Sequence, residues 1–124
     1  MRGMKISNIV GRTGETVAAD FLRDKGYQLI EFNFRKNYTE IDIIAIYRNT
    51  TVFVEVKTRK NDSFGTPFEA ITRTKIANLV HTAHVYMKLH PNLPKAMRID
   101  AIGVTLDEDN KLESIEHVEN ISGF

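Results

Sequence analysis

The 124-residue sequence has no cysteine, which excludes a disulfide framework and a thiolate metal site. No apolar run approaches the roughly 18 residues that a membrane-spanning helix needs. The N-terminal segment MRGMKISNIVGRTGE lacks the apolar core of a signal peptide, and the chain has no repeat, low-complexity tract or linker. We therefore expect one soluble, cytoplasmic domain over residues 1–124, long enough to bury a single core.

Net charge is also nearly absent, at +1 for the whole chain, but the charges are unevenly distributed. Residues 107–124 hold six acids and one base, so residues 1–106 hold 16 bases and 10 acids, a balance of +6. A moderately basic body has the charge that a phosphate-binding protein requires. Ordinary surface charge for solubility explains the same balance, so charge alone does not assign a partner.

Hydrophobic periodicity predicts helices over residues 8–25 and 72–89. Gly26 marks the end of the first helix, and Thr72 is suited to cap the second. Strands are predicted over residues 27–35, 39–47, 51–58, 95–106 and 111–119. This order predicts an α/β domain with a mixed central sheet flanked by helices, and residues 100–120 form an acidic edge hairpin. Within the first strand, Ile30, Phe32 and Phe34 are expected to share one face.

The stretch Glu40–Lys57, EIDIIAIYRNTTVFVEVK, carries charged side chains inside two predicted strands. Alternation puts Phe53, Glu55 and Lys57 on one face of the second strand, opposite a row of valines. In the predicted strand over residues 39–47, Asp42 shares its face with isoleucines. Because the segment RNT between the strands is short and polar, the strands are expected to pair antiparallel and to bring Asp42 near Glu55.

Two carboxylates at close range repel each other, so one takes up a proton unless a cation lies between them. All-oxygen ligands suit a hard cation, Mg²⁺ or Mn²⁺. With Lys57 over the same site, two acids and a lysine around such a metal are the groups used in metal-assisted phosphodiester hydrolysis. The alternative is a structural ion-pair cluster, which is often less stable than apolar packing when it is buried.

Five charged residues elsewhere have two interpretations each. Glu15 either complements the dipole of the first helix or reaches the metal. Lys75, in the first turn of the second helix, either binds a phosphate or is exposed to water, which reduces its unfavourable interaction with the helix dipole. Arg59 and Lys60 leave the strand that carries Lys57, where they either hold a phosphodiester backbone or belong to a solvated loop. Asp100 either supports the site residues or is a structural partner of Arg98 or another arginine, and its apolar neighbours favour the structural role.

The pattern of Asp42, a spacer and Glu55-Val56-Lys57 resembles the D…(D/E)-x-K signature of the restriction-endonuclease-like nuclease superfamily. A longer set of matches, spread over residues 11–105, resembles the YraN-like family of small bacterial proteins. These matches are Gly14-Glu15, Asn33-Phe34-Arg35, Glu40-Ile41-Asp42, Phe53 to Arg59, Phe64-Gly65, Pro67, Glu69-Ala70 and Arg98-Ile99-Asp100. The chain departs from the family pattern at Thr39 and at Ile76-Ala77-Asn78, which weakens the expectation of nucleic-acid contacts from the second helix.

The resemblance implies a restriction-endonuclease-like core and a Mg²⁺- or Mn²⁺-dependent nuclease. The expected substrate is DNA, with branched or single-stranded DNA among the candidates, or RNA, and DNA is favoured over RNA. The alternative is a nucleic-acid-binding module that lacks turnover or needs a partner, and a homodimer is a further expectation. The implied metal ligands are Asp42, Glu55, the Val56 carbonyl and Glu15; Lys57 orients the attacking water, Glu40 supports Asp42, and Arg35, Arg59, Lys60 and Lys75 contact nucleic acid.

Overall fold

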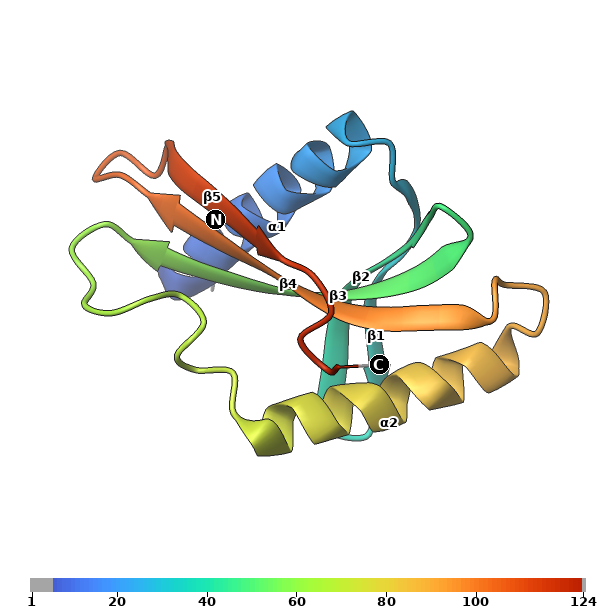
Figure 1. Cartoon of the computed structure of the whole chain (residues 1–124). Helices are drawn as coiled ribbons and strands as arrows, with labels where there is room; N and C mark the ends of the chain where they lie inside the picture. The colour runs from blue at the N-terminus through green and yellow to red at the C-terminus, as the bar shows by residue number, and fades with distance from the viewer. Residues whose placement is uncertain (1–5, 124) are drawn as a thin grey trace.

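The computed structural model describes residues 6–123, with side-chain surroundings from residue 10 onward, and forms a five-stranded sheet with one helix on each face (Figure 1). The elements are α1 (Ile6–Asp24), β1 (Gln28–Lys36), β2 (Thr39–Tyr47), β3 (Thr50–Lys60), α2 (Arg73–Leu89), β4 (Ala96–Leu106) and β5 (Leu112–Val118). The strands lie in the order β1-β2-β3-β4-β5, and only the β3–β4 pair is parallel. The expected α/β class, the mixed sheet, the flanking helices and the order of elements are confirmed.

Each face of the sheet has its own apolar core. On one face, Val52 and Val54 of β3 pack in a buried cluster with Leu22 of α1. On the other face, Phe53 packs in a buried cluster with Leu79 of α2. The central strands are covered on both sides. Their side chains are therefore apolar on both faces of the sheet and do not alternate between apolar and polar. Between residues 6 and 123, no helix is long and apolar enough to cross a membrane.

The predicted helix ends are confirmed by their hydrogen bonds. Gly26 has a left-handed φ of 93°, and the Tyr27 N–H donates to the Leu22 carbonyl over 3.0 Å, as in a glycine-terminated helix. At the start of α2, the Thr72 hydroxyl accepts the Lys75 N–H over 3.1 Å. These hydrogen bonds fix where α1 ends and where α2 begins.

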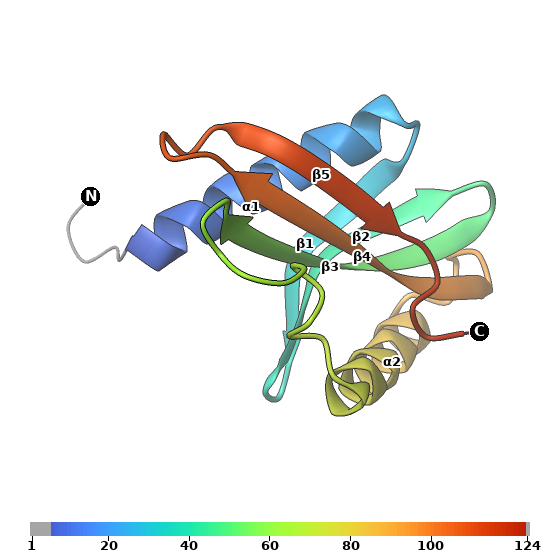
Figure 2. The ribbon, with the colours of Figure 1, turned by 60° about the vertical axis from the view of Figure 1, so that its left-hand side comes forward.

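Strands β2 and β3 pair along only part of their length. Their register runs from Tyr47↔Thr50 to Ile43↔Val54. Beyond that point β2 continues to pair with β1, whereas β3 continues to pair with β4. The β1–β2 hairpin therefore diverges from the rest of the sheet, and in both ribbon views its tip turns toward the side of α2 (Figures 1 and 2). We call this point of divergence the fork.

The prediction that Ile30, Phe32 and Phe34 share one face of β1 is wrong. Phe34 packs on the α2 side, edge-to-face with Tyr86 at a ring distance of 4.9 Å. Phe32 instead faces α1 and remains 44% exposed. Between them Asn33 has a left-handed φ of 54°, which interrupts the alternation, and asparagine tolerates this conformation better than most residues.

Asp100 is fully buried in β4 and has the structural role that its apolar neighbours predicted. Its carboxylate accepts hydrogen bonds from Arg98 Nε over 2.9 Å, from His117 Nε2 over 2.8 Å and from the Asn120 N–H over 2.9 Å. Burial favours the protonated acid, but these three donors outweigh burial and hold the pKa of Asp100 below its ordinary value. The cluster joins β4, β5 and the segment after β5.

The contact between α1 and β3 gives a prediction about packing. A Cβ atom added at Gly14 would lie 2.7 Å from the Thr58 Cβ, whereas one added at Gly11 would meet nothing within 4 Å. We expect Gly14→Ala to destabilise the protein by about 1–3 kcal/mol, because overpacking outweighs the better helix propensity of alanine. Gly11→Ala, the matched control in the same helix, is expected to stabilise it by up to about 1 kcal/mol. Urea unfolding measures both, and equal stability of the two variants would contradict the close approach.

Candidate functional site

Asp42 and Glu55 lie at the fork, each in the strand position next to the last β2–β3 pair. Asp42 is 7% exposed and Glu55 is 3% exposed. The Asp42 Oδ2 atom accepts the Val56 N–H over 2.7 Å. The aspartate side chain thus replaces the backbone acceptor that β3 loses where β2 turns away, because a buried backbone donor requires a partner.

The surroundings of Asp42, including Glu55, favour its protonated form. Burial raises the pKa of Asp42 from 3.8 to about 8, with further upward contributions from a hydrogen bond to Glu55 and from the negative charge of Glu55. The Val56 N–H lowers this pKa, and the more distant charge of Glu15 raises it. A hydrogen bond between two carboxyl groups requires a proton on one of them. Without a cation, the pair therefore keeps a proton at neutral pH.

Lys75 provides the cation that lies nearest this pair. Its Nζ atom is 3.2 Å from the Glu55 Oε2 atom. The approach falls outside hydrogen-bond angles, so within the described part of the chain this buried oxygen has an ionic neighbour but no hydrogen-bond donor. Lys75 was expected to contact nucleic acid; the structure places it against Glu55 at the N-terminal end of α2.

Lys57 lines an open hollow of about 550 Å³ beside the fork, between α1 and the C-terminal half of β3. Val56 lines the same hollow. Because the N–H and C=O of one strand residue point to the same side, and the Val56 N–H bonds to Asp42, the Val56 carbonyl faces the fork as well. The hollow that Lys57 lines is thus connected to the fork through Val56.

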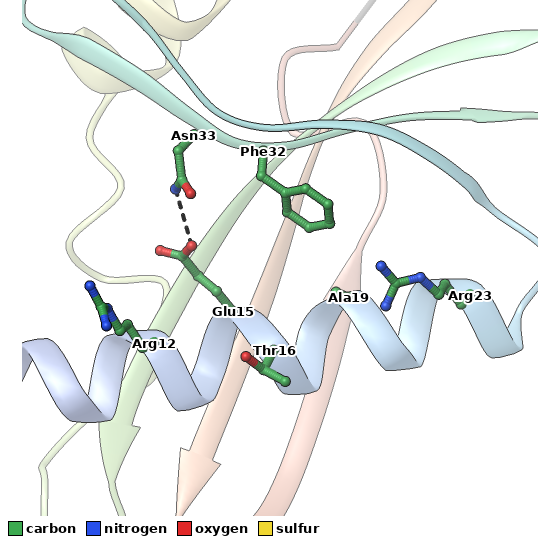
Figure 3. A pocket seen from close by; sticks show the side chains of 7 residues that line it. All are labelled: Arg12, Glu15, Thr16, Ala19, Arg23, Phe32 and Asn33. Atoms are coloured by element: carbon green, nitrogen blue, oxygen red, sulfur yellow. Dashed lines mark hydrogen bonds between the residues drawn. The ribbon is translucent and has the colours of Figure 1, made fainter.

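Glu15 does not join Asp42 and Glu55. Its Oε1 atom accepts a hydrogen bond from Asn33 Nδ2 over 3.1 Å (Figure 3). Over residues 6–123, no three Asp, Glu or His side chains form a group that could hold a metal ion. The structure therefore gives two converging carboxylates, with Glu15 acting on Asp42 through its charge.

Arg59 and Lys60 are engaged by the protein itself. The Arg59 guanidinium donates to the Gly65 carbonyl and lies 3.5 Å from the Thr105 hydroxyl, which fixes the loop after β3. The Lys60 ammonium donates to Asn110 Oδ1 over 2.6 Å, at the turn between β4 and β5. Both residues still line the hollow that contains Lys57, so they shape its wall and contribute positive charge there.

Arg35 and Glu40 lie opposite each other near the tip of the β1–β2 hairpin. Arg35 Nη2 is 3.9 Å from Glu40 Oε1, and the arginine is largely exposed. An ion pair of this length in water contributes little to stability. Glu40 was expected to support Asp42, but its nearest charged contact is with Arg35.

Sequence reasoning missed a second hollow, of about 360 Å³, between α1 and β1 (Figure 3). Its lining residues are Arg12, Glu15, Thr16, Ala19, Arg23, Phe32 and Asn33. Arg12 and Arg23 recur at helical spacing, so the sequence held a signal for this face of α1. The exposed position of Phe32 could not be found in that way, because it depends on the backbone conformation of Asn33.

The donor set at the fork suits a hard divalent cation. Asp42 and Glu55 supply carboxylate oxygens, and the carbonyl of Val56 supplies a third oxygen, all of which are types that Mg²⁺ and Mn²⁺ prefer. The buried Glu55 oxygen without a hydrogen-bond donor is the acceptor that such a cation would satisfy.

Comparison with known proteins identifies the family. A family model described as "Uncharacterised protein family UPF0102" matches residues 14–104. A UPF0102 protein of Syntrophomonas wolfei subsp. wolfei is 41% identical over 111 residues, which cover 90% of this chain and 95% of the relative. The UPF0102 protein Lxx14785 of Leifsonia xyli subsp. xyli is 50% identical over 95 residues, which cover 77% of this chain and 80% of the relative.

Among solved structures, an fdxN element excision controlling factor protein from Anabaena variabilis is similar with a TM-score of 0.45 and 12% identity, covering 84% of this chain and 98% of that one. This likeness is too distant to support an argument about function. The sequence relatives are close and cover most of both chains. They confirm the YraN-like resemblance, and the chain belongs to the UPF0102 family.

Proposed function

We propose that this protein is a metal-dependent nuclease that hydrolyses phosphodiester bonds in nucleic acid, with DNA favoured over RNA. The observation that carries the proposal is the buried pair of Asp42 and Glu55 at the fork. A buried aspartate whose pKa is raised by burial and by a neighbouring buried glutamate is unfavourable for folding, and apolar side chains would pack there more stably. Such a pair is characteristic of a site whose function needs the charges.

The proposed metal is Mg²⁺ or Mn²⁺, held by Asp42, Glu55 and the Val56 carbonyl. Bound there, it would supply positive charge to the phosphoryl oxygens and promote ionisation of a water molecule. Lys57 would orient the attacking water from the adjoining hollow and stabilise the negative charge that develops on the phosphoryl oxygens. Glu15 would serve as an outer ligand by releasing Asn33.

The surroundings of the pair support a phosphodiester substrate. Lys57, Arg59 and Lys60 line one hollow, which gives it a positive wall, and Val56 in the same lining bonds to Asp42. Positive charge in a cleft attracts a phosphate backbone. The acidic strand β5 lies at the far edge of the sheet, away from the fork.

One observation favours a second candidate function, a nucleic-acid-binding module without turnover. Lys75 already supplies a cation 3.2 Å from Glu55, and no described third side chain completes a metal group. In this alternative Lys75 neutralises Glu55 permanently, and the carboxyl pair at the fork binds no metal and takes no part in catalysis. The two functions differ in whether metal-dependent cleavage occurs.

A cleavage experiment tests the nuclease. Wild-type protein is mixed with labelled single-stranded, duplex, flap and four-way-junction DNA, and with RNA, in Mg²⁺, Mn²⁺ or EDTA. We expect cleavage only with metal, and a loss of about 100-fold or more in Asp42→Asn, Glu55→Gln and Lys57→Met, because each change removes charge that acts on the transition state. Glu116→Gln, an exposed change on β5, is the matched control and should keep full activity.

Each outcome of this experiment supports one function. Cleavage that survives Glu55→Gln would rule out the proposed mechanism. Retarded bands on a gel without cleavage by the wild type would favour the binding module. Loss of cleavage in Lys75→Met but not in Lys57→Met would assign the catalytic lysine to α2 and correct the role given to Lys57.

The carboxyl pair also predicts how stability depends on pH. The pKa of Asp42 is higher in the folded protein than in the unfolded chain. The contribution of Asp42 to the free energy of unfolding is therefore fully present below about pH 4, where the group is protonated in both states, and is lost as the pH rises toward 8. Asp42→Asn keeps an oxygen for the Val56 N–H, gains a donor toward Glu55 and does not titrate. In EDTA we expect this variant to be more stable than the wild type at pH 8, by an amount on the order of 2 kcal/mol.

Urea unfolding at pH 4.5 and pH 8 measures the difference, which should be small at the lower pH. Adding Mn²⁺ at pH 8 should then stabilise the wild type and leave Asp42→Asn nearly unchanged, because the variant lacks one ligand. A variant that is less stable than the wild type at pH 8 in EDTA would show that the pair is not strained.

A further inference from the structure

The hollow between α1 and β1 presents an aromatic ring between two arginines (Figure 3). Phe32 projects from β1 toward α1 and is 44% exposed, although Ile43, its partner on β2, is buried. Arg12 and Arg23 lie toward the two ends of the hollow. They are eleven residues apart on α1, which corresponds to about 16 Å along the helix axis.

The exposure of Phe32 follows from the backbone conformation of the next residue, Asn33. Asn33 adopts a left-handed φ of 54° and donates its side-chain N–H to Glu15. This conformation turns Phe32 away from the face that contains Phe34 and fixes the strand above α1. A large apolar ring left in water is unfavourable, so an arrangement that holds it there indicates a ligand with an apolar face.

The arginines of this hollow are more available than Arg59, Lys60 and Lys75, which contact other groups of the protein. No hydrogen bond or ion pair joins Arg12 to a residue of the described chain beyond residue 9. Arg23 pairs with Asp20 over 3.3 Å, and both side chains are more than half exposed. Such a pair is weak in water, so Arg23 exchanges readily to a phosphate.

The two hollows described above share Glu15, which lines both of them. One contains Phe32 with Arg12 and Arg23, and the other contains Lys57 and Val56, whose N–H bonds to Asp42 at the fork. A chain of nucleotides lying along α1 would therefore pass from the aromatic ring to the fork.

We infer that the hollow between α1 and β1 holds an unpaired nucleotide of the substrate, with its base stacked on Phe32 and its neighbouring phosphates bound by Arg12 and Arg23. This inference rests on the proposed function, because the strand must continue to the fork. Aromatic rings with flanking basic residues bind single strands by stacking and by charge, largely without sequence preference. A base inside a duplex has both of its faces covered, so the substrate class is nucleic acid with an unpaired segment next to the cut.

Binding of DNA that carries 2-aminopurine tests this inference, because the fluorescence of this base falls when it stacks. Wild-type protein is titrated in EDTA, where no cleavage occurs, with a single strand, a duplex bearing an unpaired end and a blunt duplex. We expect quenching with the first two substrates only. Phe32→Ala should abolish the quenching and weaken affinity at least about fivefold, whereas Phe32→Tyr should retain both.

Matched controls separate stacking from general effects. Leu112→Ala removes a side chain of similar exposure, 48%, on β5 and should leave binding unchanged. Arg12→Gln and Arg23→Gln should each lower the slope of log affinity against log salt by about 0.7. Arg48→Gln, the same charge change in the turn between β2 and β3, should leave this slope unchanged. Melting curves should show that Phe32→Ala still folds and loses only a small part of the stability, because 44% of the residue is exposed.

Failure of this inference is distinguishable from failure of the nuclease. Quenching that persists in Phe32→Ala, or a blunt duplex bound as tightly as the single strand, would overturn the inference whether or not the protein cuts. Quenching that depends on Phe32, without cleavage in Mg²⁺ or Mn²⁺, would retain the nucleotide site and refute the nuclease. Cleavage of blunt duplex that Phe32→Ala leaves unchanged would retain the nuclease and refute the site.

Discussion

The hydrogen bond from the Val56 N–H to the Asp42 carboxylate is the interaction on which the candidate site depends. Where β2 turns away, the edge of β3 needs a new acceptor, and a side chain provides it. Because Asp42 meets this requirement, its carboxylate lies beside Glu55 in a buried environment. The electrostatic strain of the pair therefore follows from the way the sheet divides, and the apolar clusters on both faces supply the stability that tolerates it.

The residues around the fork divide into those that the protein holds and those that face the two hollows. Lys75, Arg59 and Lys60 have partners within the chain, so their positive charge is fixed in place. Fixed charge suits catalysis because it costs no reorganisation during the reaction. Arg12 and Phe32 face water in the hollow beside α1, where the protein has left charge and apolar surface uncovered.

Much of this arrangement can be predicted from the sequence. Alternation and turn residues predict the strands, and the pairing of β2 with β3 predicts that Asp42 and Glu55 approach each other. The point at which that pairing stops is not predictable, because it depends on how the hairpin twists against α2. The same limit applies to Phe32, whose direction is decided by one left-handed residue, Asn33. The contact of Lys75 with Glu55 joins residues 20 positions apart across a crossover, so no local pattern encodes it.

The contact between Gly14 and Thr58 holds α1 against β3, the strand that carries Glu55. Gly14 precedes Glu15 in α1, Thr58 follows Lys57 in β3, and the Thr58 side chain lies too close to Gly14 to admit a methyl group there. Because β1 pairs with β2 and β2 with β3, Phe32 and the carboxyl pair are also held at a set separation. A strand bound as proposed at both places would be cut a fixed number of nucleotides from its last unpaired base, whatever the sequence between them.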